Sequence, residues 1–412
     1  MKTNNNIPAY RFQGYTDAWE LRKLGEVARF RRGSFPQPYG NSEWYDGDGA
    51  MPFVQVADVT DEMNLVGDTK QKISRKAQPL SVFAEEGSVL VTLQGSIGRV
   101  AITQYGAFID RTVLIFENFN LPVDNLFWAY IIKQKFIEEA KCAPGGTIKT
   151  ITKEVLSDFD IKLPSHPEQS AIGTFCSTLD QHITLHQRKL DTLKDQKKTY
   201  LKLLFPAKGQ TKPALRFQGF EDDWEEVKLG EVVEKSGSGG TPKSTNKAYY
   251  GGNIPFLSIT DITQSGKYIT NTEKTLTEIG LENSSAWIVP KGAISLAMYA
   301  SVGKLAILKT DVATSQAFFN MVFSNEIVRD YVYFILDKAQ LFNEWLPLIS
   351  TGTQGNLNAQ KLKEYIIPLP SLPEQEAIGT FFQTLDQEIA QVEDKLASLK
   401  EMKKTLLRKL FV

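Results

Sequence analysis

The chain has 412 residues, enough for two to four domains, because single hydrophobic cores seldom grow beyond about 250–300 residues. With 42% hydrophobic and 23% charged residues, its composition is that of a globular protein, which excludes the disordered and fibrous classes. The net charge of −1 weighs against a nucleic-acid binder with one large basic surface, although a total can hide a local excess.

The beginning of the chain and its two cysteines predict a cytoplasmic protein. Residues 1–10, MKTNNNIPAY, lack the apolar core of a signal peptide, and no run of about 18 apolar residues could span a membrane. Cys142 and Cys176 fit a reducing compartment better than a disulfide framework. We therefore expect a cytoplasmic location and no membrane partner.

The chain contains a long internal repeat. Residues 11–27, RFQGYTDAWELRKLGEV, return about 205 positions later as residues 216–232, RFQGFEDDWEEVKLGEV. Further matching segments follow in the same order: MPFVQVADVT (51–60) and IPFLSITDIT (254–263), GSIGRVAI (95–102) and ASVGKLAI (300–307), LPSHPEQSAIGTF (163–175) and LPSLPEQEAIGTF (369–381). A repeat of this length exceeds a solenoid unit and predicts a duplicated domain followed by a helix. A duplication that merely enlarged the protein is the alternative.

The part of each copy that diverges predicts a mixed α/β domain. Short runs bounded by glycines favour strands at 52–59, 88–93 and 99–103 in the first copy and at 255–262, 293–299 and 304–308 in the second. Apolar residues at helical spacing predict helices at about 124–141 and about 325–342. Because the shared segments surround divergent ones, we expect two heads that differ from each other.

The shared tails, 163–205 and 369–411, predict two long helices. Pro167 and Pro373 precede Glu-Gln pairs, as is typical of a first helical turn. Apolar residues then recur every three or four positions over about 37 residues, or about 55 Å. The seam residues are Ile172, Leu179, Ile183, Leu193, Ile378, Leu385, Ile389, Leu396 and Leu399. We expect the helices to pack antiparallel as a coiled-coil-like rod with a head at each end.

Signals of enzymatic chemistry are weak. GSGGTPKS (237–244) is close to a phosphate-binding G-x-x-x-x-G-K-S loop, but Pro242 replaces its second glycine and no helix can follow. His182 and His186 lie one helical turn apart without a third ligand, so we interpret them as solvated helix residues. His186 and Gln196 interrupt the seam, where they either fix the register or lie partly exposed. We expect no metal site and no catalysis by this chain alone.

The combination of these repeats resembles a known family. Two copies of R-F-x-G-[FY]-x-x-x-W-x-x-x-x-L-G-E, each followed by a variable domain with [IM]-P-F and then by L-P-x-x-x-E-Q-x-A-I-G and a long helix, are similar to the specificity subunits of type I restriction-modification systems, the HsdS family. The resemblance covers essentially the whole chain. It implies that each variable part is a target-recognition domain that reads one half of a split double-stranded DNA sequence.

The resemblance also implies a fold and a set of partners. The fold is α+β, with two pseudo-two-fold-related mixed α/β target-recognition domains joined by two long antiparallel helices. The expected divisions are a first recognition domain (1–162), a central helix (163–206), a linker leading into the second copy (207–221), a second recognition domain (222–368) and a C-terminal helix (369–412). The helices would set the spacer and dock two methyltransferase subunits, with restriction and translocase subunits added outside.

No cofactor is expected on this chain. The resemblance implies that S-adenosylmethionine, ATP and Mg²⁺ are bound by the partner subunits, whose activities would be adenine-N6 methylation and ATP-dependent cleavage of DNA. Methyl transfer to adenine requires the base to be flipped out of the duplex, and the pocket for it would lie on the partner. A near-zero net charge agrees with partners that supply much of the attraction to phosphate.

Residue types that read base edges or hold phosphates occur in the glycine-rich loops of both heads. In the first head the candidates are Arg31, Arg32, Ser34, Gln37, Tyr39, Gln94, Ser96, Arg99 and Lys149. In the second head they are Ser238, Thr241, Lys243, Ser244, Tyr299, Ser301, Lys304, Thr353 and Gln354. For each of them a solvated loop residue is the alternative. RRGSFPQPYG (31–40) differs so much from SGSGGTPKST (236–245) that the first loops of the two heads cannot be aligned residue by residue.

A competing hypothesis from another class is a two-headed scaffold that grips proteins and reads no DNA.

Overall fold

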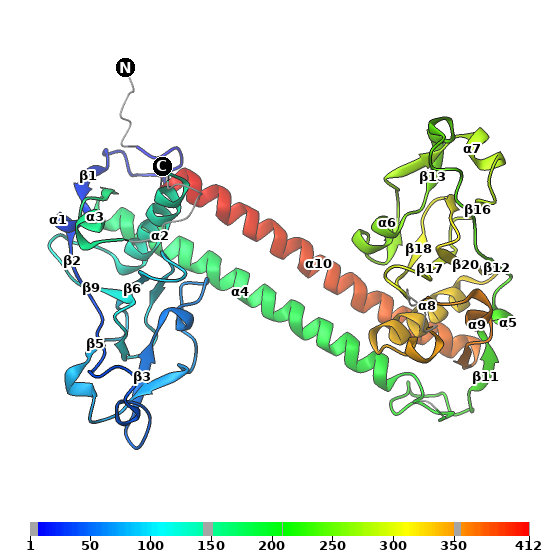
Figure 1. Cartoon of the computed structure of the whole chain (residues 1–412), viewed down its shortest axis with the longest axis horizontal. Helices are drawn as coiled ribbons and strands as arrows, with labels where there is room; N and C mark the ends of the chain where they lie inside the picture. The colour runs from blue at the N-terminus through cyan, green and yellow to red at the C-terminus, as the bar shows by residue number, and fades with distance from the viewer. Residues whose placement is uncertain (1–6, 143–150, 208, 350–355, 412) are drawn as a thin grey trace. The chain divides into compact units, whose positions relative to one another are not determined.

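The computed structural model describes residues 7–142, 151–207, 209–349 and 356–411. They form two compact units, one of residues Met1–Arg188 with Asp394–Val412 and one of residues Lys189–Glu393. Each unit contains one mixed α/β head, and each of the two long helices contributes one part to each unit (Figure 1). The expected combination of two α/β domains with two long helices is therefore confirmed.

The first head is built on two four-stranded sheets, with the strand orders β2-β9-β6-β7 and β4-β3-β8-β5. The strands are β2 (Ala28–Arg32), β3 (Met51–Val54), β4 (Gln71–Ile73), β5 (Val82–Ala84), β6 (Val89–Thr92), β7 (Val100–Ile102), β8 (Ala107–Ile109) and β9 (Val113–Phe119). Helix α2 (Asn125–Cys142) packs on the first sheet, where Trp128 lies edge-on to Phe116 with ring centroids 5.3 Å apart. A second apolar cluster, which includes Leu90 and Ile109, joins the two sheets.

The second head repeats this plan with one strand more. Its sheets have the orders β12-β20-β17-β18-β14 and β15-β13-β19-β16. The strands are β12 (Lys235–Gly237), β13 (Tyr250–Phe256), β14 (Tyr268–Ile269), β15 (Lys274–Leu276), β16 (Trp287–Val289), β17 (Ile294–Ala297), β18 (Leu305–Leu308), β19 (Val312–Thr314) and β20 (Phe318–Val322). Helix α8 (Glu326–Leu341) takes the place of α2, and its Tyr331 and Phe334 are fully buried.

Shorter elements complete the heads. They are α1 (Leu24–Val27) and α3 (Lys153–Ser157) in the first head, and α5 (Leu229–Val232), α6 (Ile259–Gln264), α7 (Glu278–Glu282) and α9 (Ala359–Lys363) in the second. Two strands end well before their predicted ends, since the run at 52–59 is a strand only to Val54 and the run at 255–262 only to Phe256. In the second run Ser258 and Asp261 exchange side-chain and backbone hydrogen bonds, and this capping box starts α6 instead.

The duplicated phrase joins each head to a long helix. The strand in each phrase, β1 (Glu20–Lys23) or β11 (Glu225–Lys228), pairs antiparallel with the strand before the helix, β10 (Asp160–Leu163) or β21 (Ile366–Leu369). The helices that follow are α4 (His166–Leu203) and α10 (Leu372–Leu410). Each phrase is therefore the point where the chain enters a head beside the start of a long helix.

A buried ion pair fixes each phrase to the first turn of its helix. Arg11 donates two hydrogen bonds of 2.7 Å to the carboxylate of Glu168, and Arg216 donates bonds of 2.7 and 2.8 Å to that of Glu374. Both glutamates are almost completely buried. Since a two-pronged arginine–carboxylate pair is demanding in geometry, the repeated Arg and Glu are explained by one shared contact.

Aromatic residues of the phrase pack between head and helix. Trp19 and Trp224 are buried in the same clusters as Ile172 and Ile378 of the helices, and Phe12 lies edge-on to Phe175 at 5.5 Å. Trp224 also donates a hydrogen bond from its indole nitrogen to Glu374 at 3.1 Å. These side chains belong to the core and not to a DNA-reading surface.

The long helices run antiparallel within each unit. Contacts join early positions of α4 to late positions of α10, and late positions of α4 to early positions of α10. The pairs are Asp180 with Lys403 and Gln187 with Lys400 in the first unit, and Lys194 with Glu393 and Lys197 with Asp386 in the second. The backbone bond from Tyr10 to Lys409 in the first unit recurs as the bond from Leu215 to Leu203 in the second.

Most of the predicted seam is buried. Ile172, Leu179, Leu193, Ile378, Leu385, Leu396 and Leu399 are buried, while Ile183 and Ile389 are half-buried. The seam departs from the simple spacing at one turn, because Cys176 and Phe382 are buried while their neighbours Phe175 and Phe381 are not. Gln196 is exposed and His186 is half-buried, with its Nδ1 2.8 Å from the carbonyl oxygen of His182. His186 and Gln196 are therefore partly exposed positions, not buried residues that fix the register of the helices.

Candidate nucleic-acid interface

Three loops meet at one end of the sheet that contains β9 in the first head and at the same end of the sheet that contains β20 in the second. In the first head β2 and β6 both pair antiparallel with β9, so the loops after β2 and β6 emerge beside the turn before β9. In the second head the loops after β12 and β17 emerge in the same way beside the turn before β20. We call these three segments the loop edge: residues 33–41, 93–99 and 110–112 in the first head, and 238–246, 298–304 and 315–317 in the second.

Backbone hydrogen bonds connect the three loops at this edge. In the first head Leu93 donates to the carbonyl oxygen of Thr112 at 2.8 Å, and Gly33 donates to that of Val113 at 2.9 Å. In the second head Met298 donates to the carbonyl oxygen of Ala317 at 2.8 Å in the same way, whereas Gly239 donates to that of Ser315 at 3.2 Å, a residue of the turn that is not the counterpart of Val113. The central turn is thereby held between the other two loops in both heads.

Two glycines settle the alignment of the first loops. A Cβ atom on Gly33 would lie 2.2 Å from the carbonyl oxygen of Ile109, and one on Gly239 would lie 1.8 Å from that of Thr314. Ile109 and Thr314 occupy the same place in the repeat, so Gly33 and Gly239 do as well. Both positions require glycine because the loop passes the end of β8 or β19 too closely for any side chain. The sequence alone did not permit this alignment, since the neighbouring residues differ in type.

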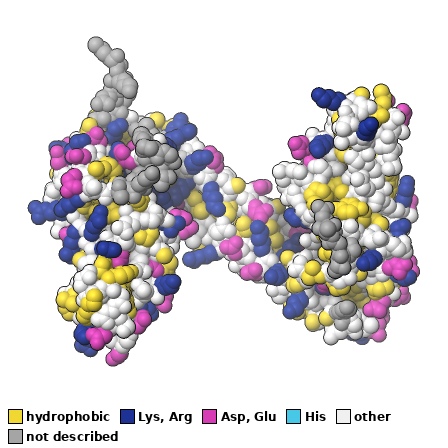
Figure 2. All heavy atoms as spheres, viewed as in Figure 1, with side chains coloured by type: hydrophobic (Ala, Val, Ile, Leu, Met, Phe, Trp, Pro, Cys, Tyr) yellow, Lys and Arg dark blue, Asp and Glu magenta, His cyan; other side chains and the backbone are white. Residues whose placement is uncertain are grey.

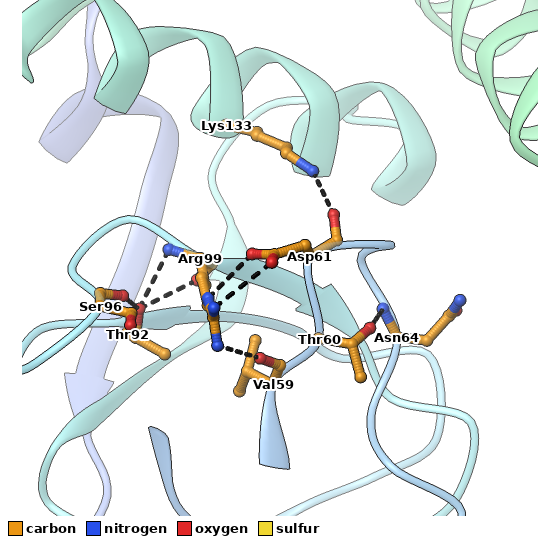
Figure 3. Close-up of polar contacts among 8 residues, drawn as sticks. All are labelled: Val59, Thr60, Asp61, Asn64, Thr92, Ser96, Arg99 and Lys133. Atoms are coloured by element: carbon orange, nitrogen blue, oxygen red, sulfur yellow. Dashed lines mark hydrogen bonds and ion pairs between the residues drawn. The ribbon is translucent and has the colours of Figure 1, made fainter. Parts of the chain in front are cut away.

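Arg99 is held in place by a carboxylate that the sequence analysis did not select (Figure 3). Its Nε lies 2.9 Å from Oδ1 of Asp61, and Nη2 donates to Oδ2 at 3.3 Å. The backbone oxygen of Asp61 accepts a 2.7 Å bond from Lys133 of α2, and burial lowers the pKa of that lysine. Arg99 therefore stands at the loop edge in a fixed pose, still about one-third exposed.

The other two predicted arginines of the first head are also engaged. Arg31 forms an ion pair with Glu117 on the neighbouring strand β9, and both side chains are exposed. Arg32 donates to the carbonyl oxygen of Ile151 at 3.2 Å. Both line a small apolar cavity of about 110 Å³ with Phe30. An arginine that already holds a carboxylate must exchange it for DNA, and this lowers the net gain from contact.

The remaining described candidates of the first head differ in how exposed their side chains are and in whether those side chains already form hydrogen bonds. Gln37, Tyr39 and Gln94 are exposed on the loop edge. The hydroxyl of Ser34 accepts a 3.0 Å bond from the backbone of Val82, so it supports the fold. The carbonyl oxygen of Ser96 accepts a bond from the hydroxyl of Thr92, while its own side chain is exposed.

In the second head the described candidates are all exposed. They are Ser238, Thr241, Lys243, Ser244, Tyr299, Ser301 and Lys304. Thr241 donates a 2.8 Å hydrogen bond to Gln316, and Lys304 forms no ion pair among the described residues. Lys149, Thr353 and Gln354 lie outside the described residues. Contact of any of these residues with DNA remains a prediction.

Two exposed residues at the centre of the loop edge were missed from the sequence. Arg111 and Gln316 occupy the same place, at the tip of the turn before β9 or β20. The sequence-based candidates all came from glycine-rich loops, and neither of these two residues lies in such a segment. The signal that could have found them is a polar residue of base-reading type just before a buried strand at the same repeat position.

Charges of both signs are mixed over the surface. Figure 2 shows Lys and Arg side chains interspersed with Asp and Glu on the visible face of each unit. This agrees with the net charge of −1. On this face no large excess of positive charge, the feature that supplies affinity for phosphates, stands out.

The described residues offer no competing chemical site. They contain no group of three His, Cys, Asp or Glu side chains that could hold a metal ion. The segment 237–244 is followed by a three-residue 3-10 helix, Lys247–Tyr249, and therefore lacks the helix N-terminus of a phosphate-binding loop. In the part of the chain that is described, no helix is both long and apolar enough to cross a membrane.

Sequence comparison assigns the chain to a family. The family model described as the type I restriction modification DNA specificity domain matches residues 16–195 and again residues 221–401. The specificity subunit of the type I restriction enzyme MjaIX from Methanocaldococcus jannaschii is 33% identical over 46% of this chain and 44% of its own length. The MjaVIII specificity subunit of the same organism is 24% identical over 94% of this chain and 91% of its own length.

Solved structures show the same fold. The S subunit of the type I restriction-modification system of M. genitalium superposes with a TM-score of 0.62 at 19% identity, covering 98% of this chain and 99% of that one. A chain from a study of complex assembly and conformational transition of the type I system has a TM-score of 0.56 at 19% identity, with the same coverage.

Two unlike heads on a shared plan, each with a loop edge and a long helix, define a two-headed recognition protein. The chain belongs to the type I restriction-modification DNA specificity family. It is a specificity subunit, the DNA-recognising and non-catalytic member of a type I restriction-modification complex.

Proposed function

We propose that each head reads one half of a split double-stranded DNA target through its loop edge. The observation that carries the proposal is the contrast between the two edges. In both heads backbone hydrogen bonds tie the central turn to the two neighbouring loops, yet the exposed side chains of the loops differ almost throughout. A shared scaffold with different base-reading side chains is what two unlike half-sites require.

The long helices act as the spacer in this proposal. A helix of about 38 residues is about 57 Å long, which corresponds to about 17 base pairs of B-DNA. The expectation that the heads are related by a pseudo-two-fold axis is part of the same proposal, because half-site spacing then follows from the rod. The equivalent helix contacts in the two units support it.

The proposal places chemistry on partner subunits. Two methyltransferase subunits would dock on the helices and bind S-adenosylmethionine, and restriction and translocase subunits would bind ATP and Mg²⁺. This chain would bind none of these cofactors, and its own part would be to place the complex on DNA. Because the target is genomic DNA, we place the complex in the cytoplasm.

The proposal is tested by co-expressing the full chain with a methyltransferase subunit encoded beside it and mapping methylated adenines across a genome. One split motif is expected. Replacing residues 20–150 by those of another family member should change one half of the motif and leave the other half intact. Failure to detect a motif, or a motif that survives the replacement unchanged, would refute the proposal.

A further inference from the structure

The turn at the centre of the loop edge presents one side chain in the same way in both heads. In the first head the carboxylate of buried Asp110 accepts hydrogen bonds from the backbone and hydroxyl of Thr112, at 2.9 and 2.5 Å. In the second head the hydroxyl of buried Ser315 accepts a 3.2 Å bond from the backbone of Ala317. Both turns are thus closed by a polar side chain that bonds two residues on. The residue between them, Arg111 or Gln316, is exposed at the tip.

Each tip residue is oriented by the same position of the neighbouring loop. The glycine alignment makes Phe35 equivalent to Thr241, since each lies two residues after its glycine. In the first head the guanidinium of Arg111 lies over the ring of Phe35, 4.7 Å from its centroid. In the second head Thr241 donates a 2.8 Å hydrogen bond to the amide oxygen of Gln316. The two heads therefore differ at both positions of this pair: Phe35 supports Arg111 in the first head, and Thr241 supports Gln316 in the second.

The tip side chains keep their recognition groups available. Arg31 and Arg99 hold carboxylates, whereas Arg111 forms no ion pair among the described residues. Contact with an aromatic face occupies the flat side of a guanidinium and leaves the N–H groups at its rim free to donate. Gln316 accepts one bond on its amide oxygen, which has a second lone pair, and its amide nitrogen can still donate twice.

Arginine and glutamine match different bases. Arginine donates two bonds to O6 and N7 of guanine, and glutamine pairs with N6 and N7 of adenine. We propose that position 111 of the first head and position 316 of the second are base-reading positions, with Arg111 reading a guanine in one half-site and Gln316 an adenine in the other. Phe35 and Thr241 are positioning residues, because they act through the tip side chain. This inference rests on the proposed function and adds to it two residues and the base that each reads.

The experiment uses the full chain with its methyltransferase partner in cells that lack other adenine methylation. Methylated adenines are mapped for the wild type and for Arg111→Ala, Arg111→Lys and Gln316→Ala. Arg111→Ala should relax one guanine position in one half-site, with discrimination reduced about 10- to 100-fold, and leave the other half intact. Gln316→Ala should relax one adenine position in the other half-site. Arg22→Ala is the matched control, since Arg22 is exposed on β1 and pairs with Glu20 away from the loop edge.

Arg111→Lys separates base reading from simple attraction to phosphate. Lysine keeps the charge but not the two-pronged donor, so the same guanine position should relax while methylation persists. The double variant Phe35→Thr/Arg111→Gln transplants the second pair into the first head and should shift the preference at that position toward adenine. If Arg111→Ala alone abolishes methylation, this double variant still tests the inference, because it keeps a supported base-reading side chain at the tip.

Two results would overturn the inference while the proposed function stands. One is a wild-type split motif that Arg111→Ala and Gln316→Ala both leave unchanged. The other is an Arg111→Ala variant in which methylation falls equally at all sites while discrimination at every motif position is retained, because the side chain would then supply only attraction to phosphate. A wild type that yields no split motif would instead refute the proposed function.

Discussion

Asn320 shows how single residues hold the loop edge of the second head. It is fully buried, its amide nitrogen donates to Gly237 at 3.1 Å and to Thr314 at 2.8 Å, and its amide oxygen accepts from Ser295 at 2.7 Å. Ile115 occupies the same position in the first head. The two heads therefore support a similar edge with a polar network in one case and an apolar contact in the other.

Replacing Asn320 by alanine should destabilise the second head. The change leaves the hydroxyls of Ser295 and Thr314 without their partner inside the core, which costs about 1–3 kcal/mol of unfolding free energy. Denaturant unfolding of the full chain measures this loss. Asn283→Ala is the control, because Asn283 is exposed and bonds only its own helix, so a change below about 0.5 kcal/mol is expected. Equal losses for both variants would contradict the role of the buried network.

Cys176 should be almost unreactive in the folded chain. Burial, with a smaller effect of the nearby Asp180 carboxylate, raises the pKa of the Cys176 thiol from 9.0 to about 12. Thiolate falls tenfold for each pH unit below the pKa, so at pH 8 its population is about a thousandfold lower than in the unfolded chain. A thiol reagent applied to Cys142→Ser, with and without denaturant, measures the two rates. Similar rates in both conditions would show that the thiol is accessible.

At the scale of elements, the long helices are shared between units. Asp180 of α4 pairs with Lys403 of α10 and accepts a 2.6 Å bond from Tyr130 of α2. In the second unit Lys197 of α4 pairs with Asp386 of α10 and with Asp337 of α8. Each head helix is thus fixed to both long helices by a largely buried charged group. The fit of a head on the rod depends on both copies of the repeat.

Placing charges in the helix seam should disrupt the packing of the two long helices while the heads stay folded. Leu396 and Leu399 are buried in the first unit, and an aspartate at either site would carry an unpaired carboxylate into an apolar contact. The double variant Leu396→Asp/Leu399→Asp should lose most co-purification with a methyltransferase subunit while circular dichroism still shows folded heads. Ser398→Asp adds a charge at an exposed position between them and should assemble normally. Full assembly of the double variant would contradict the rod model.

At the scale of the whole molecule, the mixed charge agrees with the proposed division of work between this chain and its partner subunits. The net charge is −1, and basic side chains are interspersed with acidic ones. Direct readout at two loop edges can select a sequence without supplying much affinity. The chain is therefore suited to specifying a site that a larger complex holds.

This division predicts a difference in salt dependence. The logarithm of DNA affinity falls with the logarithm of salt concentration, with a slope of about −0.9 for each phosphate neutralised. We expect a shallow slope for the isolated chain and a steeper one for its complex with methyltransferase subunits, measured by fluorescence anisotropy on the same DNA. An isolated chain with a slope as steep as that of the complex would show that this chain supplies the phosphate contacts itself.

Much of the element plan follows from sequence periodicity. The helices at 125–142, 166–203, 326–341 and 372–410 lie close to their predicted positions, because long apolar repeats are the strongest local signal. The strands predicted at 52–59 and 255–262 extend too far, because capping contacts between Gln55 and Asp58 and between Ser258 and Asp261 start a helical turn there. Local chemistry of this kind competes with the pattern and decides element ends.

The sequence by itself determined the duplication, the helix seam and the family, because a repeated pattern and a repeated motif need no knowledge of contacts. Only the tertiary structure paired Arg11 with Glu168, aligned Gly33 with Gly239, and brought Arg111 and Gln316 to the centre of the loop edges. These contacts join residues distant in the chain, and their partners are chosen by strand register and by close approach of the backbone. No local pattern along the chain records either of them.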